Sequence, residues 1–374
     1  MKQTGYLILA DISGYTAFVA QTEIDHGARI LEGLTKTVVD ELRQPLHVQE
    51  IEGDAVFAYA HTDDFDRGVV LVEVLEAVYA AFRSALDNIA QCSTCTCQAC
   101  GRATDLDLKF IVHHGAFVPR RVGAHSGIGG PDVIVAHRLL KNGIRQRHGL
   151  TSYAFLTAPA VERMGVEQLA QAMTPHDETY EHLGRIDGFV YDLGDYWERL
   201  KASRNIVVSQ DGAYLAVSEE LAAPVSLAWE YYTNPRHRQV WLQSEDLSSD
   251  TGANGRYGTG TIEHCVHGKE TTVFTTLDWK PMRYVTQAFS LPFGGRMLCT
   301  ASFESVDGGT RVAVVFSQPR NEQLLKRVLL RSMIQLMGNS LRADLSRCTG
   351  LYYTMVRERA ALVAGDAAMT AVEA

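Results

Sequence analysis

The sequence predicts an α+β protein with two domains. In its first half, apolar runs and helical spacings follow the order strand, helix, strand, strand, helix, strand, which is the order of a split βαβ, ferredoxin-like core. The second half begins with a strand and a short helix, continues with Gly- and Thr-rich strands, and ends in one long helix. A length of 374 residues is enough for two such domains.

The first domain is expected at residues 1–200. Residues 6–11 form an apolar strand, and apolar side chains near a 3.6-residue spacing predict one helix over 16–42, which Pro45 ends. Gly53 joins two strands in a tight hairpin. The other expected elements are strands at 46–52, 54–60, 106–115, 152–156, 179–183 and 188–193, helices at 65–89, 132–142 and 159–164, and a polar join at 197–210.

Composition excludes several classes of protein. The chain is 46% apolar and 21% charged, as in ordinary globular proteins, and its net charge of −9 argues against a general nucleic-acid binder. No segment approaches the roughly 20 apolar residues that span a bilayer, and no signal peptide is recognised. We therefore expect a cytoplasmic protein without a membrane span or nucleic-acid partner.

Two aspartates stand at the borders of apolar strands. Asp11 ends the first strand and Asp54 begins the third, and these strands are neighbours in a ferredoxin-like sheet. Either residue alone is typical of a strand-end cap or a turn. Together the two carboxylates can hold a divalent metal ion on a triphosphate, and the helix start at residues 13–16 offers backbone N–H groups to phosphate oxygens.

These motifs resemble the catalytic domain of class III nucleotidyl cyclases over roughly residues 5–195. That family has Asp-Ile-x-Gly-(Phe/Tyr)-Thr after its first strand and Gly-Asp-Ala in its hairpin, as this chain has at 11–16 and 53–55. The resemblance implies a homodimer that binds a purine triphosphate with Mg or Mn. It implies that Asp11 and Asp54 bind two metal ions with help from the Ile12 carbonyl, and that Ser13, Gly14, Tyr15 and Thr16 contact the nucleotide.

Two further family positions bear on base choice and turnover. Glu50 stands where guanylyl cyclases have Glu and adenylyl cyclases have Lys, which favours guanine. Arg138 matches the arginine that stabilises the transition state, but Ile134 replaces the asparagine that orients the ribose. A triphosphate-binding Lys is also missing; Arg185 is the nearest basic candidate, and Lys141 and Asn142 are alternatives near Arg138.

Four cysteines crowd into an insertion at about residues 91–104. Cys92, Cys95, Cys97 and Cys100 supply the four thiolates that tetrahedral zinc prefers, and we expect a structural Zn site. An iron–sulfur cluster, a redox-active pair and plain surface thiols remain alternatives. His113 and His114 are close enough in sequence to compete as ligands, although strand alternation points only one of them inward.

The second domain, expected at 211–362 before a disordered tail at 363–374, resembles the START-like, helix-grip (SRPBCC) ligand-binding domains. The matching features are the opening strand, Ala223-Pro224, Trp279-x-Pro281, the Gly308-Gly309 turn and the long last helix. In that fold a curved sheet wraps the helix around an apolar cavity, which implies a hydrophobic ligand.

Three functions follow from these patterns. The first is a cyclase that makes a cyclic nucleotide at a dimer interface, with Asp and Arg from opposite chains, while the second domain senses an apolar molecule. The second is a regulatory protein that binds a nucleotide without turnover, which Ile134 favours. The third, catalysis by the START-like domain, ranks last because no acid–base set is recognisable there.

Overall fold

The computed structural model describes residues 2–43, 46–92, 97–122, 125–202, 205–251, 256–291, 295–320 and 324–372. It divides the chain into two units, Met1–Ser203 and Arg204–Ala374. The border lies between the expected domain limits of 200 and 211. Among the described residues, no helix is both long and apolar enough to cross a membrane.

The first unit is built on a sheet of the expected ferredoxin-like order. Its strands are β1 (Gln3–Ser13), β2 (His47–Glu52), β3 (Ala55–His61), β4 (Asp107–Val122), β5 (His125–Gly129), β6 (Tyr153–Thr157), β7 (Thr174–Tyr180) and β8 (Gly184–Asp192). They lie in the order β2-β3-β1-β4-β6-β8-β7, and β5 pairs with β4. The first four strands are antiparallel neighbours, which is the arrangement of a split βαβ core.

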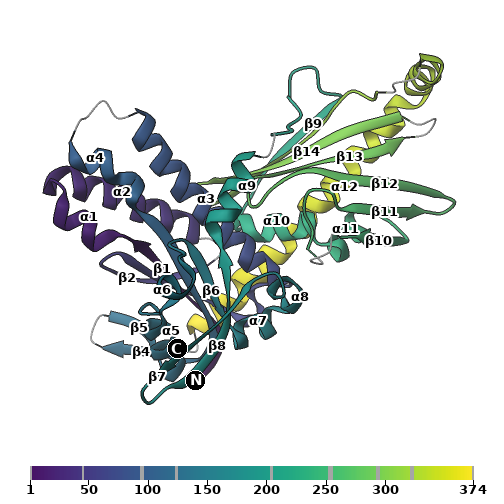
Figure 1. The fold of residues 1–374 in the computed structure, drawn as a ribbon. Helices are drawn as coiled ribbons and strands as arrows, with labels where there is room; N and C mark the ends of the chain where they lie inside the picture. The colour runs from purple at the N-terminus through teal and green to yellow at the C-terminus, as the bar shows by residue number, and fades with distance from the viewer. Residues whose placement is uncertain are drawn as a thin grey trace. The chain divides into compact units, whose positions relative to one another are not determined.

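Helices cover this sheet. α2 (Ile24–Leu42) and α3 (Val69–Cys92) pack side by side, as Figure 1 shows, because each presents an apolar stripe at helical spacing. The other helical segments are α1 (Tyr15–Gln21), α4 (Gln98–Arg102), α5 (Pro131–Leu139), α6 (Ile144–His148), α7 (Ala158–Met164), α8 (Glu167–Ala170), α9 (Leu193–Ala202) and the 3-10 turns η1 (Thr62–Asp64) and η2 (Ala103–Asp105). One face of the sheet and α5 share a core with Leu7, Leu9, Phe57, Ile111 and Phe155.

Three expectations for the first unit were wrong in detail. The single helix over 16–42 is two helices, because Thr22 takes an extended conformation and its hydroxyl donates to the Phe18 carbonyl at 2.8 Å, closing α1. The fourth strand continues past Gly115 and turns back into β5. The polar join begins with α9, whose Trp197 is buried against the unit.

The second unit is one antiparallel sheet with three helices. Its strands are β9 (Leu215–Leu221), β10 (Asp246–Asp250), β11 (Ile262–His267), β12 (Glu270–Lys280), β13 (Tyr284–Leu291), β14 (Gly295–Val306) and β15 (Gly309–Phe316), in the order β10-β11-β12-β13-β14-β15-β9. The helices are α10 (Val225–Thr233), α11 (Pro235–Trp241) and α12 (Leu324–Val372).

The last helix is fastened to the unit by two buried tyrosines. The Tyr352 hydroxyl donates to the Ala228 carbonyl of α10 at 2.9 Å, and the Tyr353 hydroxyl donates to the Val312 carbonyl of β15 at 3.1 Å. The last helix therefore packs against the sheet, as expected for a helix-grip fold. The helix continues to Val372, so residues 363–372 are helical where a disordered tail was expected.

Candidate functional site

The two aspartates meet at one end of β1 and β3. In the antiparallel register Asp11 lies opposite Ala55, and the Ile12 N–H donates to the Asp54 carbonyl at 3.2 Å. The Asp11 side chain is 15% exposed and Asp54 is half-buried. Burial, and then repulsion from Asp11, raises the pKa of the Asp54 carboxyl above its usual value. The structure thus brings together the two carboxylates that the motifs singled out.

Lys109 is a third member of this site that the motifs did not reveal. It lies opposite Asp11 on β4, and its Nζ is 2.9 Å from Asp11 Oδ2. The same ammonium donates to the Leu140 carbonyl at 3.3 Å, at the C-terminus of α5. Its charge also opposes the rise in the Asp54 pKa. A built-in cation therefore already neutralises one of the two carboxylates.

The donor set still fits a hard divalent ion. Asp11 and Asp54 provide carboxylate oxygens, and Ile12 follows Asp11 on β1 with its N–H bonded to the Asp54 carbonyl. Mg and Mn prefer such oxygen ligands, whereas a nitrogen or sulfur ligand among these residues would favour other metals. Because Lys109 holds one oxygen of Asp11, Asp54 and the second Asp11 oxygen are the ligands open to an ion.

The turn after Asp11 has the shape that the motif predicts. Gly14 has a φ of 87°, in the left-handed region, and a Cβ there would lie 3.0 Å from the Asp105 carbonyl oxygen. Glycine suits both conditions. The Ser13 hydroxyl donates to the Thr151 carbonyl at 3.0 Å, while no side chain caps α1, which begins at Tyr15. Ser13 therefore positions the turn, and Thr16 is exposed beyond it.

Glu50 and Arg138 occupy exposed positions on two different elements. Glu50 lies on β2 opposite Phe57, beside a register shift in the β2–β3 pairing. Arg138 lies in the last turn of α5, with its guanidinium carbon 5.5 Å from the centre of the Tyr180 ring. Ile134, one turn earlier, is 61% exposed. A large apolar side chain at such exposure would be covered if a second protein surface packed against α5.

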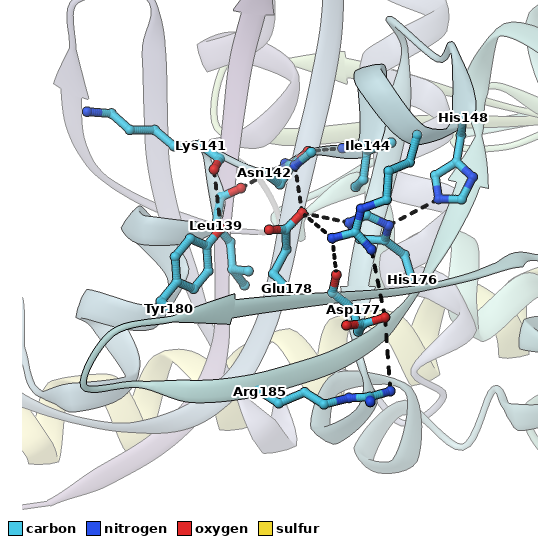
Figure 2. A network of polar contacts seen from close by, with 12 residues as sticks. Leu139, Lys141, Asn142, Ile144, His148, His176, Asp177, Glu178, Tyr180 and Arg185 are labelled. Carbon is cyan, nitrogen blue, oxygen red and sulfur yellow. Dashed lines mark hydrogen bonds and ion pairs between the residues drawn. The ribbon is translucent and has the colours of Figure 1, made fainter.

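Arg185, Lys141 and Asn142, the alternatives to the missing phosphate-binding lysine, differ in their hydrogen-bond partners, as Figure 2 shows. Asn142 holds the turn between α5 and α6: its amide donates to the Leu139 carbonyl at 2.8 Å and its Oδ1 accepts from the Tyr153 hydroxyl at 2.9 Å. Arg185 donates to Asp187 at 2.7 Å. The Lys141 side chain extends away from this network (Figure 2).

Figure 2 also shows that the network continues onto β7, where a buried acid is fully engaged. Glu178 Oε1 accepts from the Gly143 N–H at 2.6 Å and lies 2.8 Å from His176 Nε2, whose other ring nitrogen is 3.0 Å from His148. Burial lowers the pKa of His176. We assign this network to structure, because it fixes the turn that follows α5, the helix that carries Arg138.

The cysteine insertion is described in part. Cys97 and Cys100 lie at α4, and the side chains of Cys92 and Cys95 lie outside the described residues. His113 is 2.9 Å from the Thr157 hydroxyl and His114 is 3.0 Å from the Thr62 hydroxyl, so both bind within the sheet region instead. The histidine beside Cys97 is His26 of α2, with 3.2 Å between Nδ1 and Sγ, and sequence spacing gave no signal for it.

The second unit contains a cavity of about 700 Å³. It lies between the sheet and α12, and the aromatic residues in its wall are Tyr232, Trp241, Phe274, Phe289, Phe316 and Tyr352. Arg238 also lines it; this side chain is 2% exposed and donates to Glu263 at 3.0 Å. A partly open cavity with a wall of aromatic and polar side chains suits a hydrophobic small molecule that also carries polar groups.

Comparisons with known proteins give separate matches for the two units. Residues 222–346 match the family model of the Activator of Hsp90 ATPase homolog 1-like proteins. The second unit is START-like. Residues 31–148 match a family described only as proteins of unknown function, DUF2652. An uncharacterized protein of Mycobacterium tuberculosis (strain ATCC 25618 / H37Rv), Rv2561/Rv2562, is 26% identical over 160 residues, which are 43% of this chain and 72% of that protein.

Similar solved structures include nucleotidyl cyclases. The guanylyl cyclase Cya2 is 11% identical, with 51% of this chain and 92% of that chain covered and a TM-score of 0.39. The adenylyl cyclase CyaB from P. aeruginosa is 12% identical, with 50% and 94% covered and a TM-score of 0.37. The α+β fold class is confirmed for both units.

Proposed function

We propose that the first unit binds a purine nucleotide triphosphate with one divalent metal ion, and that the second unit binds a hydrophobic small molecule. The observation that carries the nucleotide proposal is the convergence of Asp11 and Asp54 at one end of neighbouring strands. Burial, and secondarily repulsion between the two convergent carboxylates, raises the pKa of Asp54. A bound cation relieves that repulsion.

The residues around the pair have distinct roles in this proposal. Asp54 and the open oxygen of Asp11 hold Mg or Mn, which supplies positive charge to the phosphates when bound. Lys109 supplies a second positive charge from the protein itself, so one ion is enough where the cyclase resemblance implies two. The turn from Ser13 to Thr16 faces the phosphates, and Glu50 accepts hydrogen bonds from guanine.

Cyclisation of the nucleotide is the second candidate function, and Arg138 favours it. The exposed guanidinium on α5 can reach the site of a second chain in a homodimer, where it would stabilise charge on the phosphorus. Ile134 opposes this candidate because its side chain cannot orient a ribose by hydrogen bonding. We therefore propose binding as the function, and turnover is measured in the same experiment.

The nucleotide experiment uses the full chain. ATP, GTP, CTP and UTP are titrated in turn with Mn²⁺ present and absent, and mass spectrometry follows cyclic products. Asp54→Ala should abolish metal-dependent binding. Asp63→Ala, which removes a carboxylate that is 96% exposed, should leave it unchanged. Binding with no product supports the regulatory function; product that requires Asp54 and Arg138 supports the cyclase. Absence of binding by every nucleotide would refute both.

The hydrophobic ligand is tested separately in the second unit. The fluorescent probe anilinonaphthalene sulfonate should bind the native chain with saturation. Leu345→Trp should weaken binding several-fold, because Leu345 lines the cavity and the larger ring fills it. Leu362→Trp is the matched control, since Leu362 is 61% exposed and outside the cavity wall. Equal affinities for both variants would show that the probe binds elsewhere.

A further inference from the structure

Glu23 and His26 lie one helical turn apart at the start of α2, and both contact the cysteine insertion. Glu23, which precedes α2, accepts the backbone N–H groups of Gln98 and Ala99 at 3.2 and 3.1 Å, at the start of α4. A hydrogen bond from its own backbone N–H, and then these two, lower the pKa of the Glu23 carboxyl. Ala99 and Ala103 of the insertion are fully buried. The first turn of α2 and the first turn of α4 therefore face each other at a fixed distance.

Three metal-binding side chains meet at this contact. His26 lies one turn after Glu23, and its Nδ1 is 3.2 Å from Cys97 Sγ. Cys97 caps α4, accepting the Cys100 N–H at 3.4 Å. One ligand atom from each of His26, Cys97 and Cys100 lies within 4.8 Å of the other two. All three side chains have intermediate exposure to solvent.

These separations suit a tetrahedral ion. Zinc bonds of about 2.3 Å to sulfur and 2.0 Å to nitrogen place neighbouring ligand atoms roughly 3.5–3.8 Å apart. The 3.2 Å between His26 Nδ1 and Cys97 Sγ, and the 4.8 Å limit on all three separations, are compatible with that spacing. Two soft thiolates and an imidazole favour zinc over Mg or Mn, whereas the Asp11–Asp54 pair has the opposite preference. The two sites would therefore select different metals by ligand chemistry.

We propose that His26, Cys97 and Cys100 bind a structural zinc ion that fastens the insertion to α2. The described residues supply three of the four ligands of a tetrahedral ion. Two of the four cysteines expected as ligands, Cys97 and Cys100, belong to this set, and the side chains of Cys92 and Cys95 lie outside the described residues. The metal clamps two elements far apart in sequence, in addition to closing a local loop.

The test measures zinc in the purified full chain. About one zinc per chain is expected in the native protein and in His264→Ala, a control that removes an exposed histidine from the second unit. His26→Ala and Cys97→Ser should lower zinc affinity at least tenfold in a chelator competition. His26→Cys should restore affinity, because a thiolate replaces the imidazole as the ligand. This rescue separates a ligand from a residue that only supports folding.

Cobalt substitution identifies the ligands by a second readout. Co²⁺ in the native site should give the absorption of a tetrahedral ion with thiolate charge-transfer bands, and His26→Cys should strengthen those bands by one added thiolate. Zinc bound with native affinity by His26→Ala would remove His26 from the site. Apo protein with no Co²⁺ spectrum, a Cys97–Cys100 disulfide, or an iron–sulfur chromophore would overturn the proposal.

Discussion

Two ion pairs of similar length have different surroundings in the two units. Lys109 and Asp11 are 2.9 Å apart, with side chains 19% and 15% exposed, at the edge of the first unit's sheet. Arg238 and Glu263 are 3.0 Å apart and 2% and 1% exposed, in the wall of the second unit's cavity. Glu263 also accepts from Gln287 at 2.9 Å. Length alone does not distinguish these pairs; access to water and to competing ions does.

The difference indicates what each pair does. The buried pair has no solvent route by which another cation could replace Arg238, so it serves the shape of the cavity. The pair at the sheet edge remains accessible, and a metal ion can compete with Lys109 for Asp11. Charged groups with accessible partners suit an exchangeable binding site, whereas charged groups that are fully enclosed suit a fixed framework.

The largest effect is expected from breaking the buried pair. Glu263→Gln leaves the Arg238 charge enclosed without its partner, and we expect a loss of about 3–5 kcal/mol in the free energy of unfolding. Urea denaturation followed by tryptophan fluorescence measures it. The double variant with Arg238→Met and Glu263→Met should recover most of the loss, because it buries no charge. A loss below about 1 kcal/mol for Glu263→Gln would show that the Arg238–Glu263 pair contributes no more than an exposed ion pair does.

The pair at the sheet edge should respond in metal affinity. Lys109→Ala frees the second oxygen of Asp11 and removes a competing positive charge, so we expect Mn²⁺ to bind roughly tenfold more tightly, equal to about 1.4 kcal/mol. Isothermal titration of the metal alone measures this change. Lys36→Ala, which removes a lysine that is 73% exposed on α2, is the control. Weaker Mn²⁺ binding in Lys109→Ala would show that the ammonium supports the site instead of competing.

A smaller effect is expected in the pH dependence of stability. The folded-state pKa of Asp54 is raised, so the folded protein favours the protonated carboxyl, and its stability falls as pH rises from the ordinary Asp value through the raised value. Asp54→Asn removes this penalty. The variant should therefore be more stable than the native chain at pH 7, with the difference shrinking at acid pH. Thermal melts across that range measure it; a pH-independent difference would contradict the assignment.

The smallest effect is expected from an exposed arginine with two glutamates. Arg311 on β15 lies 2.7 Å from both Glu220 and Glu304, with side chains between 44% and 66% exposed. Arg311→Ala should lower the free energy of unfolding far less than Glu263→Gln, and less at high salt, because water screens these charges. The same urea denaturation at low and high salt checks this. A loss as large as that of Glu263→Gln would mean that burial does not rank these pairs.

Local sequence patterns predicted the parts of this site that lie on single strands. Asp11 and Asp54 mark strand ends, and the order of elements places those strands together. Lys109 was missed because its role depends on the β1–β4 register, which sets it opposite Asp11 and which periodicity alone does not determine. His26 was missed for a similar reason, since it reaches Cys97 across a contact between α2 and α4.

The predicted helix boundaries were wrong where the residue pattern did not change at the end of a helix. Thr22 interrupts the helix although the apolar pattern runs on from α1 to α2, because one side-chain hydrogen bond outweighs the pattern there. The sequence predicts a polar join in place of α9 because most side chains of that helix are polar, although Trp197 is buried. In both places the deciding interaction involves one residue, and a periodicity averaged over many does not register it.

The Lys109 ammonium links two events that would otherwise be independent. It bonds Asp11 on one side and the last-turn carbonyl of α5 on the other. An ion that binds Asp11 changes the charge that this ammonium balances, so we expect occupancy of the site to affect the contact between Lys109 and the end of α5. The linkage is reciprocal: a contact that immobilises the end of α5, such as a second chain packed over Ile134, would change the affinity of the site for its ion.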